Sequence, residues 1–177
     1  MKNIYKISLV LFVSLSIIVS SCKKEVDGCT DSSAMNYLST ANSNDGSCIF
    51  AYEIAQGSWN ITSECDVVTV FGFSIPLDSL LPEKIQITGA GNNVVSMDIN
   101  GENVLADVPY DGTVTIKDDQ TISFDTSDFD PTGFLGIVDI TISGTGIISS
   151  DSNGDLLLNF ENALLSIDAD CAITFTR

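Results

Sequence analysis

The chain has 177 residues and a formal net charge of −17, from 24 acidic and 7 basic side chains, and it contains no histidine. The lack of histidine excludes catalytic triads with a histidine base and zinc sites that need imidazole ligands. A chain this acidic has little with which to neutralise phosphates, which argues against nucleic-acid binding. Because 44% of the residues are hydrophobic and only 18% are charged, the chain can bury a core.

Residues 1–21 have the pattern of an export signal. Lys2 and Lys6 precede an apolar stretch at 7–19, which has 13 residues, whereas about 20 are needed to span a bilayer. The following Val19-Ser20-Ser21-Cys22 resembles the lipobox of bacterial lipoproteins. The resemblance implies cleavage before Cys22, acylation of its sulfur and of its new amine, and attachment to a membrane. The alternative is ordinary cleavage, which would leave Cys22 as a free thiol.

The residue after this cysteine bears on location. Lys23 stands where many lipoproteins that stay at the inner membrane carry aspartate. We therefore expect an outer-membrane location, and the facing, periplasmic or cell-surface, stays open.

Four cysteines remain after Cys22, namely Cys29, Cys48, Cys65 and Cys171. An even number in an exported chain indicates two disulfides, with three possible pairings. Residues 30–47 are polar, with few apolar side chains, and such a segment could hardly fold without a covalent staple. This favours Cys29–Cys48, and with it Cys65–Cys171.

The segment around the first pair has a recurring pattern. Gly28-Cys29-Thr30-Asp31, Asn36-Tyr37 and Asp45-Gly46-Ser47-Cys48 resemble a short repeat of exported bacterial surface proteins. Ser32 and Ser39 stand where the repeat has prolines, and Asn44 where it has aspartate. The resemblance implies a disulfide-closed linker module over 22–50 and brings no activity with it to this chain.

Three oxygen-bearing side chains of this module, Asp31, Asn44 and Asp45, could bind Ca²⁺, the one cofactor that the sequence suggests. Their spacing does not follow an EF-hand loop. Clusters of Asn, Asp, Ser and Gly are also ordinary turn formers, and we consider turns the better interpretation.

Residues 51–177 predict an all-β domain. Apolar and polar residues alternate in short runs between Gly, Asn and Asp, which is typical of an antiparallel sheet with one wet face. About eight to ten such strands suit one barrel or sandwich. The expected strands are 57–64, 84–88, 93–99, 113–117, 121–124, 138–143, 145–149, 156–159, 163–167 and 171–176.

A disulfide between Cys65 and Cys171 would fix how the first strand pairs with the last. In an antiparallel pair, facing residue numbers then sum to 236, so that Ile61 faces Phe175 and Trp59 faces Arg177. This register sets apolar side chains together and the arginine beside the indole, a favourable cation–π contact. If these strands pair, the sheet closes on itself and leaves no free edge.

The same residues carry a second resemblance. Gln56-Gly57-Ser58-Trp59 is similar to the Gly-x-Trp opening strand of lipocalin-like domains, and Arg177 occupies the place of the arginine that covers that tryptophan. The resemblance implies an up-and-down antiparallel barrel of about eight strands around a cavity for a small apolar ligand. The sequence departs from that family because it shows no evident C-terminal helix.

Two segments outside the expected strands could contact such a ligand. The first, 67–81, carries Phe71 and Phe73 and could cover the barrel mouth or, in the interpretation we rank slightly higher, plug the core. The second, 125–136, carries Phe129, Phe134 and Leu135, which could line a pocket rim or tuck under the loop.

No nucleophile motif, phosphate-binding loop or thiolate metal cluster occurs, so we expect a protein that is not an enzyme. We expect a monomer, with the membrane and a small apolar molecule as its partners. Three functions remain open. The first is a lipid-anchored binder of that molecule. The second is a structural or interaction module with a filled barrel, and the third, ranked last, is a small hydrolase.

Overall fold

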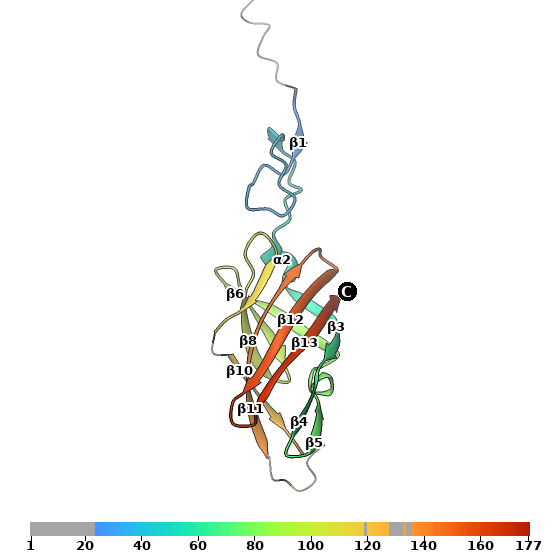
Figure 1. Ribbon diagram of the computed structural model, residues 1–177. Helices are drawn as coiled ribbons and strands as arrows, with labels where there is room; N and C mark the ends of the chain where they lie inside the picture. Colours follow the sequence, from blue (N-terminus) through green and yellow to red (C-terminus); the bar gives the residue numbers. More distant parts are fainter. Residues whose placement is uncertain (1–23, 119, 128–132, 134–135) are drawn as a thin grey trace, which may run out of the picture.

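The computed structural model describes residues 24–118, 120–127, 133 and 136–177. Figure 1 shows a small N-terminal module beyond one end of a β-barrel. The module contains the parallel pair β1 (Asp27–Gly28) and β2 (Ser43–Asn44). A short helix, α2 (Ala51–Ala55), leads from it into the barrel. Within the described ranges, no helix has both the length and the apolar character needed to cross a membrane.

The barrel has eight antiparallel strands in closed up-and-down order, which confirms the predicted fold class. Around the ring these strands are β3 (Gly57–Cys65), β6 (Lys84–Gly91), β7 (Val94–Ile99), β8 (Glu102–Asp107), β9 (Thr113–Ile116), β11 (Ile137–Ile148), β12 (Asn153–Asn162) and β13 (Ile167–Thr176). Outside the ring, β10 (Gln120–Asp125) pairs with β11, and β4 (Val67–Val70) forms a hairpin with β5 (Phe73–Pro76).

The first and last barrel strands pair in the predicted register. Cys65 lies opposite Cys171, and Ile61 lies opposite Phe175. The disulfide Cys65–Cys171 joins the two strands. The ring is therefore closed covalently as well as by backbone hydrogen bonds.

Three of the predicted strands differ from the structure, and three strands after residue 56 were not predicted: β8, and β4 and β5 in segment 67–81, which was expected to lie outside the strands. β8, over Glu102–Asp107, was not predicted because its alternation is broken by polar residues at both ends. Residues 163–166 form a turn in which Leu164 is 93% exposed and Ser166 has a φ of 56°, so β13 begins only at Ile167. The two predicted strands 138–143 and 145–149 are one continuous strand, β11.

β11 changes its partner partway along its length. Its residues 137–142 pair with β10, and its residues 145–147 pair with β9 on the same edge. Gly144 lies between these two parts and Gly146 lies within the second. Both occupy inward positions, where the backbone of β12 comes very close. Glycine at such positions lets a strand bend sharply.

We expect Gly146→Ala to destabilise the barrel by about 1–3 kcal/mol, the usual range for overpacking. The new Cβ would clash with the carbonyl oxygen of Asp155 and would lie 2.7 Å from the Cα of Leu156, and backbone atoms cannot move aside as a side chain can. Urea unfolding measures the effect. Thr145→Ala, an exposed position on the same strand, is the control. Equal stability of Gly146→Ala and the parent protein would contradict the close approach.

Candidate functional site

The barrel interior, where the lipocalin resemblance places a ligand, is filled by side chains. Inward residues of all the ring strands belong to one hydrophobic cluster. A ligand-sized void would leave the residues that line it accessible to water-sized molecules, yet Trp59 and Leu158 are 0% exposed and Ile142 is 1% exposed. In the part of the chain that the structure describes, several surface hollows are lined mainly by outward-facing residues. The interior is thus a packed core.

Both ends of the barrel contribute to this core. At the end nearer the module, Ala51 and Ala55 of α2 are buried, and the helix contacts β6, β7 and β11. Segment 67–81 supplies buried side chains as well: Val70 of β4, Ile75 of β5 and Leu77 of the short 3₁₀ helix η2 (Leu77–Leu80). Segment 67–81 therefore completes the core, which is the interpretation that the sequence slightly favoured.

Of the five predicted ligand-contact residues, Phe71 is the one whose side chain the structure describes. Phe71 lies in the β4–β5 turn, where it is 66% exposed and has a φ of 49°. Phe73 is the first residue of β5. Phe129, Phe134 and Leu135 lie outside the described residues, as does the predicted lipidation site Cys22. Near that loop, the Thr126 hydroxyl donates to the carbonyl of Gly136 over 2.7 Å.

Trp59 and Arg177 meet where β3 and β13 close the ring. The Arg177 guanidinium carbon lies 3.9 Å from the indole ring centroid, and Phe175 packs edge-on against the same indole at 6.1 Å. The indole N–H donates to the carbonyl of Ala55 over 2.7 Å, which fixes α2 to the barrel. The sequence predicted the pair of Trp59 and Arg177, but it gave no sign of the role of α2.

Arg177 also joins two separate segments by three hydrogen bonds to backbone carbonyls. Its guanidinium donates to the carbonyl of Asp151 over 3.1 Å and to that of Ile54 over 3.0 Å, and it donates to the carbonyl of Gln56 as well. Asp151 belongs to the β11–β12 turn, and Ile54 belongs to α2. One side chain therefore positions the helix against the turn.

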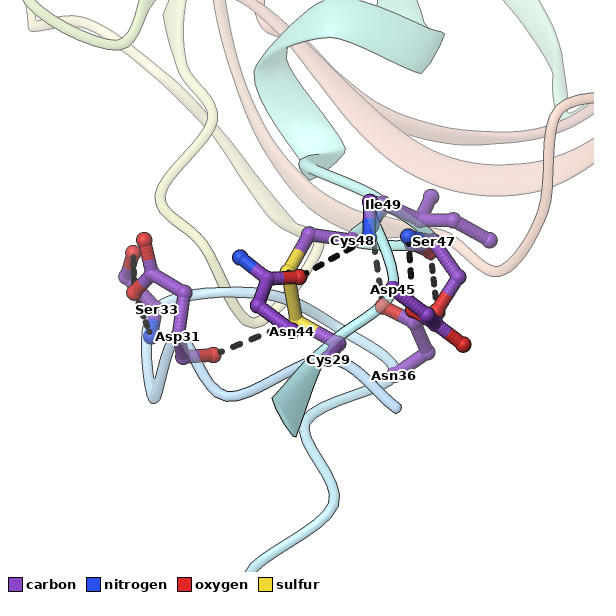
Figure 2. Close-up of a disulfide and its surroundings, with 10 residues drawn as sticks. Cys29, Asp31, Ser33, Asn36, Asn44, Asp45, Ser47, Cys48 and Ile49 are labelled. Atoms are coloured by element: carbon purple, nitrogen blue, oxygen red, sulfur yellow. Dashed lines mark hydrogen bonds between the residues drawn. A yellow bond between two sulfur atoms is a disulfide. The ribbon is translucent and has the colours of Figure 1, made fainter. Parts of the chain in front are cut away.

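The N-terminal module is closed by the predicted Cys29–Cys48 disulfide (Figure 2). Asp31 accepts hydrogen bonds from the hydroxyl and the N–H of Ser33, which hold the pKa of the Asp31 carboxyl below its usual value. Hydrogen bonds from Ser47 lower the pKa of Asp45 in the same way.

The three candidate calcium ligands do not converge. Asp31 and Asp45 lie on opposite sides of the disulfide in Figure 2. The Asn44 side chain accepts the N–H of Gly46, which is the same turn-forming hydrogen bond two residues along the chain. Within the described ranges, no group of three or more Asp, Glu, Cys or His side chains is arranged to hold a metal ion. These residues shape turns in this structure.

A crevice of about 430 Å³ lies where the module meets the barrel. Its walls come from two stretches of the chain that are remote in sequence. Residues 149–151 belong to the β11–β12 turn, and the other stretch supplies Met35, Asn36 and Ile49 of the module and Ile54 of α2. Met35 packs against the barrel core, and its methyl group lies close to Gly112. Sequence reasoning did not identify these residues, because no motif or periodicity links them.

Comparisons with known proteins yield similarity of structure only. No model of a protein family and no curated protein matches the sequence. Among solved structures, the chain is similar to EF1p2_mFAP2b bound to DFHBI, with 14% identity and a TM-score of 0.41. The alignment covers 72% of this chain and 96% of that one. It is also similar to a redesigned β-barrel, b11L5F_LGL, with 9% identity, a TM-score of 0.38 and coverage of 72% and 94%.

Proposed function

We propose that the mature protein is a lipid-anchored, non-catalytic module of the cell envelope, whose barrel is a solid scaffold that acts through its outer surface. The observation that carries this proposal is the packed interior: among the described residues, the inward side chains of the ring strands form one buried cluster in the place where lipocalin-like barrels hold a ligand. A barrel with a filled interior can bind other molecules through its outer surface and its loops.

The export signal and the lipobox-like Val19-Ser20-Ser21-Cys22 support anchoring at the envelope. Two disulfides support an oxidising compartment, since such bonds persist in exported proteins and are rare in the cytosol. The acidic surface supports partners with basic faces, because complementary charge speeds encounter and selects partners. Lys23 supports the outer membrane as the destination.

Anchoring is tested by substituting the acylated cysteine. In a Gram-negative bacterial host fed a clickable palmitate, we expect the parent protein to be labelled and to sediment with membranes. Cys22→Ala should lose the label and the membrane association, because the thiol that accepts the first acyl chains is gone. Lys23→Ala is the matched control and should keep both. Label on Cys22→Ala, or unchanged sedimentation of that variant, would rule out this anchor.

A cavity-creating substitution tests whether the barrel interior is filled. Phe160 is inward on β12 and 1% exposed, so Phe160→Ala should lower the free energy of unfolding by about 3–5 kcal/mol. An apolar cavity of this kind stays dry and binds benzene. We expect saturating benzene to raise the melting temperature of Phe160→Ala and to leave that of the parent protein unchanged. Benzene resonances that report contacts with inward residues of the parent barrel would overturn the proposal.

A further inference from the structure

The crevice between the module and the barrel has the size and composition of a small-molecule site. Its volume of about 430 Å³ falls within the range of about 300–1,000 Å³ that is typical of ligand pockets. Such pockets are mostly apolar, with a few polar groups that orient the ligand. Met35, Ile49 and Ile54 supply the apolar wall here, and the β11–β12 turn supplies the polar end.

The apolar wall is open to solvent. Ile49 is 44% exposed although it is a large hydrophobic side chain, while Met35 and Ile54 are only partly buried against the core. Asn36 supports this wall, since its amide donates to the carbonyl of Ser47 and accepts the N–H of Ile49. The Asn36 amide is therefore occupied in holding Ile49 in place. Covering Ile49 with an apolar ligand would remove its side chain from water, which is favourable.

The polar end carries one available charged group. The backbone carbonyl of Asp151 is bonded to Arg177, but its carboxylate makes no hydrogen bond or ion pair with any residue in the described ranges. The Ser149 hydroxyl already donates to the carbonyl of Asn153. The neighbouring Arg177 directs its positive charge at three carbonyls and at the face of Trp59. Asp151 therefore offers acceptor oxygens and a negative charge to whatever fills the crevice.

The crevice is also held in shape. Arg177 is bonded to the carbonyls of both Asp151 and Ile54, so one guanidinium links the polar end to the apolar wall. A site whose walls are already fixed loses less conformational entropy on binding. Because Arg177 stacks on Trp59, a ligand that disturbs either wall should also alter the surroundings of the indole.

We infer that this crevice binds a small apolar molecule with a cationic end, such as an alkyl or aryl amine, with the apolar part against Met35, Ile49 and Ile54 and the ammonium at Asp151. The net charge of the chain favours a cation over an anion at any such site. The inference does not depend on lipid anchoring or on the solid interior, because the crevice lies outside the barrel wall.

The test uses three probes of equal chain length with the disulfide-intact protein, each below its micelle concentration: octylamine, octanol and octanoate. Calorimetry and Trp59 fluorescence report binding. We expect octylamine, protonated at pH 7, to bind about tenfold more tightly than octanol, and octanoate to bind least. Equal binding of the three probes, or no binding of octylamine, would overturn the inference.

Two variants locate the site, and each has a matched control on the outer barrel wall. Asp151→Asn should reduce octylamine affinity about tenfold, to the level of octanol, whereas Asp155→Asn should leave it unchanged. Ile49→Ser should weaken both octylamine and octanol, whereas Ile147→Ser, at a comparably exposed isoleucine, should weaken neither. If the controls reduce affinity as much as the crevice variants do, octylamine binds the acidic surface in general and the inference fails.

Discussion

Loss of the Cys65–Cys171 disulfide, in the double variant Cys65→Ala/Cys171→Ala, is expected to lower the free energy of unfolding by about 4–5 kcal/mol. The bridge joins residues 106 positions apart, and closing so long a loop removes much of the conformational entropy of the unfolded chain. Domains of this size have a total stability of about 5–15 kcal/mol. Urea unfolding, followed by Trp59 fluorescence, measures the change.

The second disulfide provides the control. Cys29–Cys48 spans only 19 positions and lies within the module, so Cys29→Ala/Cys48→Ala should leave the unfolding transition of the barrel in place. The same chain-entropy relation gives it about 3 kcal/mol, confined to the module. If the two double variants shift the barrel transition equally, the covalent closure is not what stabilises the ring.

The second large effect concerns Trp59. We expect Trp59→Ala to destabilise the protein by about 3–5 kcal/mol, the usual cost of truncating a large aromatic core residue. The substitution removes a fully buried ring, its contact with Phe175 and the hydrogen bond to the carbonyl of Ala55. Equilibrium unfolding followed by far-UV circular dichroism measures the loss, since the variant has no tryptophan.

Two milder variants separate the contributions at this position. Trp59→Phe keeps an apolar ring but loses the indole N–H, so it should cost less than Trp59→Ala. Arg177→Ala should cost about 1–3 kcal/mol, from the cation–π contact and the charge-assisted hydrogen bonds to backbone carbonyls. A variant Arg177→Ala as stable as the parent would mean that the guanidinium adds nothing to closure.

Most of the fold could be predicted from the alternation of apolar and polar residues and from the positions of the cysteines. Alternation of apolar and polar residues located strands such as β7 and β9, because each has one face in the core and one in water. The register of β3 against β13 followed from a single disulfide, since one fixed pair sets the register of the whole ladder. The apolar residues at 163–167 predict a strand, but residues 163–166 form a turn in which Leu164 is exposed to solvent.

The nature of the interior could not be predicted in the same way. Inward apolar residues are required both by a barrel that holds a ligand and by one that is filled, so alternation cannot distinguish the two. What fills the centre depends on how side chains from opposite walls interdigitate, together with α2 and segment 67–81. The crevice was equally beyond prediction, because Met35, Ile54 and Asp151 come together only once the module rests on the finished barrel.

The pairing of β3 with β13 also bears on how the chain folds. Each of the other pairings within the ring joins strands much nearer in sequence, whereas this one brings together strands that begin and end the barrel. Contacts of such high sequence separation are entropically costly and slow to form, so ring closure should be the late event in folding. Until then both strands present unpaired edges that can join a neighbouring chain. Once a thiol oxidant of the exported compartment has joined Cys65 to Cys171, the two strands are held together covalently, which limits that exposure.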